Sequence, residues 1–202
     1  MSDETVAYWS GPAGDAYTAR NPVTTEAIEL RRRLWAKIAP AASNTVLEVG
    51  ANVGLHLRAI QALAPHVRLS AVEPNDSARN TLIADGIVPP ERAYAHLADV
   101  SETFDLVLTA GCLIHVPPDC LLDFCRAIHR CSHRWIVAIE YFSKEPREVI
   151  YRGESGKLWT RDYGAFWLDN FPDLKPVDNG FAWSRNSGLD DLTWWLLSKK
   201  DA

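Results

Sequence analysis

Short segments that are apolar on both faces alternate with amphipathic segments along most of this chain, and this alternation constrains the fold more than any other feature. The segment 45–49 (Thr-Val-Leu-Glu-Val) is typical, because it is almost wholly apolar and runs directly into Gly50. A strand that is apolar on both faces has to be covered by helices on both sides. We expect strands at 45–49, 67–72, 92–97, 104–108 and 135–139. The pattern predicts an α/β fold with a largely parallel sheet.

Helices are expected between these strands. The first begins with Thr24 or Thr25 as its N-cap and ends before Pro40. Two more are expected at 53–64 and 76–84. A fourth helix is capped by Asp119, and three of its apolar residues share one face: Leu121, Cys125 and Ile128.

The rhythm changes after Phe142. Two further strands are expected near 177–183 and 191–197, joined as a hairpin through a turn-rich segment at 184–190. With 202 residues the chain fits one domain with an extra segment. Residues 1–22 are rich in Tyr, Trp and Gly and indicate a loop or short helical cap, and residues 143–176 form an insertion.

Charge and composition exclude several classes of protein. The net charge of −5 argues against a nucleic-acid binder, which needs a basic face. The tandem Trp194-Trp195 could stack bases, but alternating faces of a strand should place at least one in the core. No apolar run approaches the ~18 residues that span a bilayer. The acidic start of the chain lacks the apolar core of a signal peptide. We therefore expect a cytoplasmic protein without a membrane partner.

Four cysteines lie between residues 112 and 131. In a reducing compartment they are expected to be thiols. With His129 and His133 they provide enough ligand types for zinc, but the spacing C-x4-C-x3-H-x-C-x-H matches no common zinc site. We predict no metal.

The turn after the first strand carries the strongest chemical signal. Gly50 and Gly54 let a ligand approach the backbone closely. The dinucleotide fingerprint G-x-G-x-x-G would need glycines where this chain has Asn52 and Leu55, which weakens a pyrophosphate site. Glu73 ends the second strand, and its two carboxylate oxygens can accept hydrogen bonds from a ribose diol. Together these features indicate an adenosine-type ligand at the carboxyl ends of the strands.

Three segments resemble the motifs of class I S-adenosylmethionine-dependent methyltransferases: 47–54 (Leu-Glu-Val-Gly-Ala-Asn-Val-Gly), 71–74 (Ala-Val-Glu-Pro) and 104–111 (Phe-Asp-Leu-Val-Leu-Thr-Ala-Gly). The resemblance implies a Rossmann-like, doubly wound α/β fold. In that fold a mostly parallel seven-stranded sheet has an antiparallel last strand and helices on both faces. It also implies S-adenosyl-L-methionine as the cofactor and S-adenosyl-L-homocysteine as its product.

A closer resemblance covers nearly the whole chain. The segments 8–11, 15–21, 113–116, 140–141, 151–153 and 190–194 are similar to the pseudaminic acid biosynthesis-associated methylases. This similarity implies one methyltransferase domain over 1–202, with an N-terminal lid at 1–22, a cofactor-binding core at 23–142, a substrate-binding insertion at 143–176 and a C-terminal β-hairpin at 177–202.

The class I resemblance assigns roles residue by residue. Glu48 and Gly50 approach the methionine part of the cofactor, and Glu73 holds the ribose. Leu97, Ala98 and Asp99 flank the adenine, and Asp99 can accept a hydrogen bond from its exocyclic amine. Thr109, Ala110 and Gly111 lie beneath the sulfonium. Asn52 replaces a usual glycine of the first motif. Apart from the resemblance, we interpret the N-terminal segment as a lid in which Tyr17 would cover the cofactor and Arg20 could meet its carboxylate; the alternative is that its aromatic residues simply pack against the first helix. The cofactor-binding residues we expect are Tyr17, Arg20, Glu48, Gly50, Asn52, Gly54, Glu73, Ala98, Asp99, Thr109 and Gly111.

Methyl transfer from a sulfonium needs alignment and exclusion of water, and a general base helps when the acceptor is a hydroxyl or an ammonium. His115, Glu140 and Tyr141 follow strand ends and are the catalytic candidates. His115 could equally be a hydrogen-bonded loop histidine, and Glu140 could pair with an arginine.

The acceptor site is expected between the lid and the insertion. Its candidate residues are Trp9, Tyr151, Arg152 and Arg161. The cations of the insertion could bind an acidic substrate, or they could pair at the surface with neighbouring acids.

The favoured function is transfer of a methyl group to an oxygen or nitrogen of a small metabolite, such as an acidic sugar or another secondary-metabolite intermediate. One alternative is a protein that binds S-adenosylmethionine without transferring methyl, and another is a nicotinamide-dependent oxidoreductase. The sequence leaves the oligomeric state open, a homodimer included.

Overall fold

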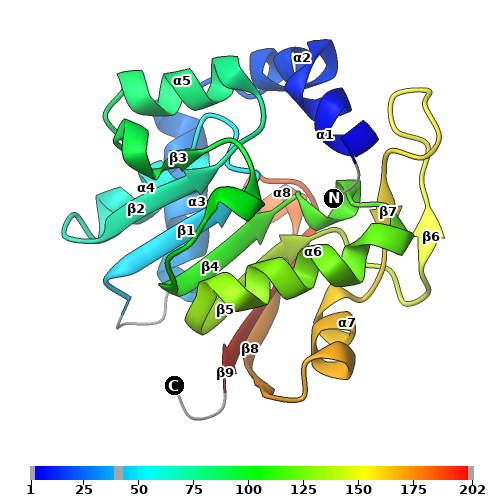
Figure 1. Ribbon diagram of the computed structural model, residues 1–202. Helices are drawn as coiled ribbons and strands as arrows, with labels where there is room; N and C mark the ends of the chain where they lie inside the picture. The colour runs from blue at the N-terminus through cyan, green and yellow to red at the C-terminus, as the bar shows by residue number, and fades with distance from the viewer. Residues whose placement is uncertain (1–2, 39–42, 200–202) are drawn as a thin grey trace.

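A seven-stranded sheet runs through the middle of the molecule in the order β3-β2-β1-β4-β5-β9-β8 (Figure 1). The computed structural model describes residues 3–38 and 43–199. Strands β3, β2, β1, β4 and β5 are mutually parallel, whereas β9 runs antiparallel to both β5 and β8. The expected Rossmann-like sheet with an antiparallel last strand is therefore confirmed.

The elements follow the predicted alternation. The strands of this sheet are β1 (Thr45–Val49), β2 (Arg68–Val72), β3 (Ala93–Tyr94), β4 (Phe104–Ala110), β5 (Ser132–Glu140), β8 (Leu174–Ala182) and β9 (Leu192–Lys199), and a separate hairpin consists of β6 (Arg147–Glu148) and β7 (Trp159–Thr160). The helices are α1 (Asp3–Ser10), α2 (Pro12–Arg20), α3 (Thr25–Ile38), α4 (Leu55–Leu63), α5 (Asp76–Ala84), α6 (Pro118–Cys131), α7 (Tyr163–Asn170) and α8 (Ser184–Ser187), with short 3-10 turns η1 (Pro90–Arg92), η2 (Leu97–Asp99) and η3 (Leu113–His115).

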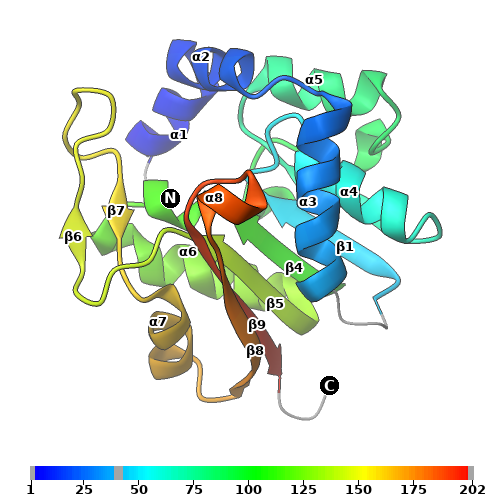
Figure 2. The ribbon, with the colours of Figure 1, turned by 180° about the vertical axis from the view of Figure 1, so that it is seen from behind.

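Helices cover both faces of the sheet. Helices α3, α4 and α5 lie on one face, and α6 and α7 lie on the other (Figures 1 and 2). The adjacent residues Trp194 and Trp195 of β9 belong to opposite cores and are 7% and 8% exposed, so both are core residues and neither is free to stack a base. All four cysteines are free thiols.

Two local expectations are corrected. The third strand is only two residues long, because the chain turns into η2, where the Asp99 carboxylate accepts a hydrogen bond from the backbone N–H of His96 at 3.3 Å. Asp119 does not cap α6. Pro117 is the N-cap, and Asp119 lies in the first turn, where a carboxylate still favours the helix dipole.

The start of α3 agrees with the sequence, because the Thr24 hydroxyl accepts a hydrogen bond from the N–H of Ala27 at 3.0 Å. Its expected stop at Pro40 lies outside the described residues. The hairpin of β8 and β9, joined through α8, also forms as expected.

Two short helices, α1 and α2, cross the carboxyl ends of the parallel strands and approach the β6–β7 hairpin (Figure 1). The Tyr8 hydroxyl donates to Glu154 at 2.9 Å, and the Lys157 ammonium lies 4.5 Å from the centroid of the Tyr8 ring. The N-terminal segment and the insertion thus meet above the sheet.

The loop between β1 and α4 depends on Gly54. This glycine has a φ of 73°, and a Cβ there would lie 2.3 Å from Leu82 Cδ2, a buried atom of α5. Gly86 has a similar φ of 68°, but its Cβ would meet no atom within 4 Å.

We predict that Gly54→Ala lowers the free energy of unfolding by about 1–3 kcal/mol more than Gly86→Ala, because only the first substitution adds steric overlap to the left-handed strain. Urea denaturation of the two variants measures the difference. An equal decrease in the free energy of unfolding of the two variants would show that steric overlap with Leu82 does not destabilise Gly54→Ala.

Candidate functional site: two joined cavities at the carboxyl ends of the strands

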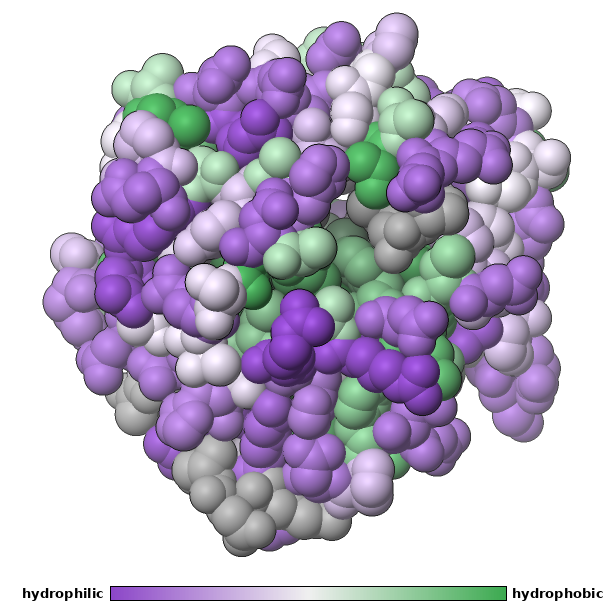
Figure 3. Space-filling view, viewed as in Figure 1, coloured by the Kyte–Doolittle hydropathy of each residue, from purple (hydrophilic) through white to green (hydrophobic). Residues whose placement is uncertain are grey.

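A cavity of about 470 Å³ lies at the carboxyl ends of β1, β2 and β4, where the strand order of the sheet reverses. Ligands of open α/β sheets bind at this position. Figure 3 shows apolar surface inside a hollow on this face, surrounded by hydrophilic side chains. The lining comes mainly from strand ends, η2, α1, α2 and α6.

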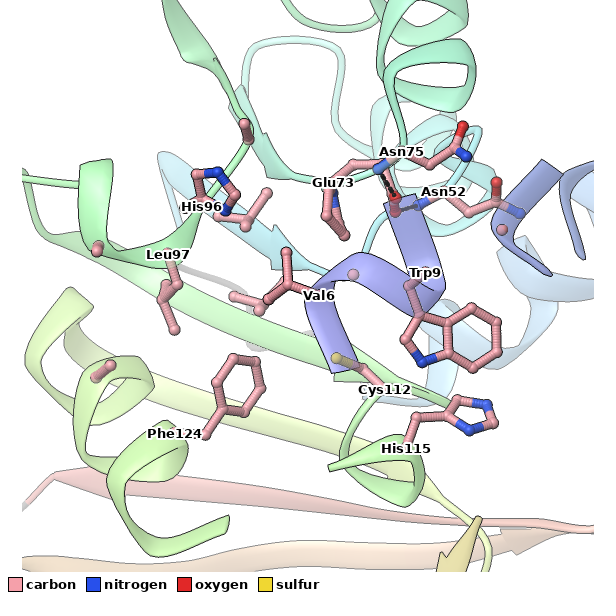
Figure 4. A pocket seen from close by; sticks show the side chains of 18 of the residues that line it. Val6, Trp9, Asn52, Glu73, Asn75, His96, Leu97, Cys112, His115 and Phe124 are labelled. Carbon is pink, nitrogen blue, oxygen red and sulfur yellow. Dashed lines mark hydrogen bonds between the residues drawn. The ribbon is translucent and has the colours of Figure 1, made fainter. Parts of the chain in front are cut away.

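Glu73 lies at the centre of the cavity wall and links two loops (Figure 4). One of its carboxylate oxygens accepts the N–H of Asn52 at 2.7 Å, and the other accepts the N–H of Asn75 at 2.8 Å. Each oxygen retains a second lone pair for a hydroxyl donor. Burial raises the pKa of Glu73, whereas the two backbone hydrogen bonds lower it.

The loop after β1 is shaped for an asparagine at position 52. Asn52 has a φ of 47°, a left-handed conformation that asparagine adopts more readily than most residues. Its side-chain oxygen accepts a hydrogen bond from the Thr18 hydroxyl of α2 at 2.7 Å. The residue that departs from the usual motif therefore ties the loop to the N-terminal segment.

Three apolar side chains gather at the end of the first cavity opposite His115, where His96 also lines the wall. Val6, Leu97 and Phe124 approach one another there from α1, η2 and α6 (Figure 4). Ala98 also lines this end. A flat, uncharged ring system would find apolar surface here on several sides.

The end of the first cavity at His115 is closed by aromatic rings. The ring of His115 lies 4.4 Å from the Trp9 ring and 5.1 Å from the Tyr151 ring, measured between centroids. Its Nδ1 lies 2.7 Å from the backbone oxygen of Lys157. Because a carbonyl only accepts, Nδ1 carries the proton and Nε2 keeps its lone pair. Burial lowers the pKa of His115 to about 4, so the ring is neutral near pH 7.

A second cavity, of about 320 Å³, adjoins the first. Both cavities are lined by a common set of residues, which forms the junction between them: Tyr17, Gly50, Asn52, Ala110, Gly111 and His115. Burial raises the pKa of Tyr17 to about 12, so His115 is the side chain of this set that offers a basic nitrogen.

The second cavity is rich in charged and polar groups. Arg20, Arg31 and Arg152 line it, together with Glu48 and Asp190. The Tyr141 hydroxyl, also in its wall, donates to Asp190 at 2.7 Å.

Glu48 is 2% exposed, and burial raises its pKa from 4.5 to about 8. One of its carboxylate oxygens has no hydrogen-bond partner among the described residues, and the same is true of Nε of Arg31. Arg31 nevertheless lowers the pKa of Glu48 by its charge. Buried polar atoms without partners are uncommon, and at the wall of a cavity they are suited to a ligand.

Most of the residues selected from the sequence line one or both cavities. Trp9, Glu73 and Ala98 line the first cavity, and Tyr17, Gly50, Asn52, Gly111 and His115 line both. Arg20, Glu48, Tyr141, Tyr151 and Arg152 line the second.

Five selected residues do not reach either cavity. Gly54 faces Leu82, Asp99 is exposed and bonded to His96, and Thr109 is 1% exposed inside the sheet. The Arg161 guanidinium lies 5.0 Å from the centroid of the Phe166 ring. Glu140 is fully buried.

Glu140 supports the loop after β4. One carboxylate oxygen accepts the backbone N–H groups of Cys112 at 3.3 Å and Leu113 at 3.1 Å. Burial raises its pKa to about 7, against the effect of these hydrogen bonds. Its position beneath the loop corrects the expectation that it meets a substrate hydroxyl.

Several cavity residues were not selected from the sequence. Arg31, His56 and Phe124 lie on helices expected from the sequence, and no sequence motif marked them as site residues. Asp190 was part of a motif but was given no role. Among these four residues, only Asp190 could have been selected from the sequence, because it lies in one of the segments that resemble the methylase family.

The described part of the chain contains neither a candidate metal site nor a membrane-spanning helix. Residues 3–38 and 43–199 contain no group of three His, Cys, Asp or Glu side chains that could hold a metal ion. In the same residues no helix is both long and apolar enough to cross a membrane.

Solved structures share this fold. No protein-family model matches the chain, and no curated protein matches it. Mitomycin 7-O-methyltransferase is 12% identical with a TM-score of 0.70 over 98% of this chain, and the chain spans 61% of that protein.

Two further structures match over most of both chains. Magnesium protoporphyrin IX methyltransferase from Synechocystis PCC 6803, with bound S-adenosylmethionine, is 11% identical with a TM-score of 0.69, covering 99% of this chain and 98% of its own. The 1,6-didemethyltoxoflavin N1-methyltransferase of Burkholderia thailandensis, with bound substrate and S-adenosylhomocysteine, is 18% identical with a TM-score of 0.65, covering 98% and 87%. At these identities the similarity establishes the fold that the chain shares with methyltransferases.

The raised pKa of Glu48 predicts a pH dependence of stability. Between pH 4.5 and pH 8 the folded protein holds a proton at Glu48 that the unfolded chain has released, so this group makes the protein less stable as pH rises. Glu140 acts in the same direction up to about pH 7. The variant Glu48→Gln should gain on the order of 1–4 kcal/mol relative to the wild type between pH 5 and pH 8. Urea unfolding of both proteins at pH 5 and at pH 8 measures this gain. If the free energies of unfolding of variant and wild type differed by the same amount at both pH values, a buried, protonated Glu48 would be contradicted.

Proposed function

We propose that this protein is an S-adenosylmethionine-dependent methyltransferase that acts on a small molecule. The observation that carries the proposal is the position of Glu73, whose carboxylate borders an apolar cavity at the strand-order reversal and keeps lone pairs free for two hydroxyls. The ribose diol would bind there, and the adenine would bind between Leu97, Ala98 and Phe124.

The rest of the cofactor would extend toward the junction of the cavities. The backbone at Gly50 and Gly111 lines that junction. The methionine end would enter the second cavity, where Glu48 and an arginine can pair with its ammonium and carboxylate. The cofactor supplies an activated methyl group, and the chain's own residues align the acceptor and exclude water.

The acceptor would approach from the second cavity. We propose His115 as the group that receives a proton from an acceptor hydroxyl or ammonium, because its Nε2 is unprotonated at the junction. Tyr141 would orient the acceptor through its hydroxyl, and Trp9 and Tyr151 would cover it. Methylation would occur on oxygen or nitrogen of an acidic sugar or another secondary-metabolite intermediate, a choice supported by the arginines of the second cavity.

A second candidate is a protein that binds the cofactor and transfers no methyl group. The burial of Glu140 favours it, because the only carboxylate among the expected catalytic residues stays outside both cavities.

Calorimetric titration with S-adenosylhomocysteine tests the proposal. We expect micromolar binding by the wild type and an affinity about 10- to 150-fold lower for Glu73→Gln, the effect of losing hydrogen bonds to a charged group. Glu102→Gln is the matched control, since Glu102 hydrogen-bonds Tyr94 and pairs with Arg68 outside the cavities.

Failure of the folded wild type to bind would rule out both candidates. Binding that Glu73→Gln leaves unchanged would contradict the ribose assignment. Transfer of tritium from methyl-labelled cofactor to an acceptor separates the enzyme from the binding protein.

A further inference from the structure

The second cavity holds more positive charge than the proposed cofactor can balance. We propose that Arg152 and Arg20 form a subsite for an anionic group of the methyl acceptor, a carboxylate or a phosphate. This inference rests on the proposed function and names the substrate class of the same site.

The turn that carries Arg152 is the first argument. The backbones of Tyr151 and Glu154 exchange two hydrogen bonds of 2.9 Å, so Arg152 and Gly153 form a two-residue hairpin turn. Their φ angles are 52° and 86°, and a turn with positive φ at both positions favours Asn-Gly or Asp-Gly. The geometry of this turn does not favour an arginine, so the presence of an arginine side chain at position 152 needs another explanation.

Position in the fold gives that explanation. The structure describes two residues other than glycine with positive φ, Arg152 and Asn52, and both line the second cavity. Strained residues gather at ligand sites, where the surroundings hold them in place.

Arg152 and Arg20 both contact Tyr151. The Arg152 guanidinium carbon is 5.8 Å from the centroid of the Tyr151 ring, and the Arg20 guanidinium donates to the Tyr151 hydroxyl at 3.4 Å. No ion pair found among residues 3–38 and 43–199 includes either arginine. Two guanidinium groups without carboxylate partners at one cavity wall suit a bidentate anion.

The charge balance points the same way. Three arginines and two carboxyl groups line the cavity, so the positive charges are in excess even when both carboxyl groups are ionised. The methionine end of the cofactor carries one positive and one negative charge, and the sulfonium adds another positive charge. Arg31 lies next to Glu48 and can bind the methionine carboxylate, which frees Arg20 from the role expected from the sequence. A complex near neutrality then requires an acceptor with negative charge.

The second cavity also holds groups suited to hydroxyls. Tyr141 and Asp190 form a hydrogen-bonded pair there, and His115 lies at the junction with the first cavity. A hydroxy acid would place its anion against Arg152 and Arg20 and its hydroxyls against these groups. In the transfer, the acceptor oxygen bonds to the methyl carbon, the carbon–sulfur bond breaks with its electron pair going to sulfur, and the hydroxyl proton moves to His115.

The test compares three probes on the protein saturated with S-adenosylhomocysteine: D-glucuronate, D-glucose 6-phosphate and uncharged D-glucose. Binding is measured by NMR titration. We expect at least one anion to bind roughly tenfold or more tightly than glucose, and Arg152→Gln to remove that advantage. Arg147→Gln, in the same hairpin, should keep it. The two anions distinguish a carboxylate site from a phosphate site.

Equal binding of glucose and the anions, an anion preference that survives Arg152→Gln, or no measurable binding of either anion would each overturn the proposal. The affinity for S-adenosylhomocysteine is measured in every variant so that each is saturated for the titration, and it should stay within about twofold of the wild type in Arg147→Gln, because Arg147 lines neither cavity. If the wild-type protein itself did not bind S-adenosylhomocysteine, the proposed function would be contradicted instead.

Discussion

The carboxylate of Glu73 is the interaction on which the rest of the site depends. It accepts backbone N–H groups from the loops after β1 and β2, and so fixes two neighbouring strand ends at the point where the sheet reverses its order. Asn75 then carries this constraint to the N-terminal helices, because its side chain donates to Asp15 of α2 at 2.8 Å. Asn52 carries it to Thr18 of the same helix. One buried carboxylate thus positions the cavity floor and the segment that covers it.

The N-terminal helices have little core of their own. Gly14 is the only residue of α1 and α2 that is buried. A side chain at position 14 would collide with the backbone of Trp9. What holds these helices is a set of polar and aromatic contacts with the loops after β1 and β2 and with the insertion. Such contacts contribute less than core burial, and segments of this kind open locally at low cost.

The sheet was predictable because it depends on local apolar patterning. The strands 45–49 and 104–108 were placed correctly because they are buried on both faces and no other element fits such runs. The third strand was overextended, because the hydrogen bond between Asp99 and the His96 backbone acts through side-chain geometry that periodicity does not reveal. Glu73 could be selected from its place at a strand end. Glu140 has a similar place in the sequence, yet its carboxylate turns beneath the loop to accept two N–H groups. The second cavity could not be predicted as a unit, since Arg31, Arg152 and Asp190 come together only through tertiary packing of α3, the insertion and the last hairpin.

A crystal structure with S-adenosylhomocysteine tests the central claim most directly, that one ligand spans the two cavities through their junction. The account predicts the ribose hydroxyls on Glu73, the adenine against Leu97 and Phe124, and the sulfur at the junction beside His115. A ligand bound elsewhere, or one with its ribose turned away from Glu73, would contradict it.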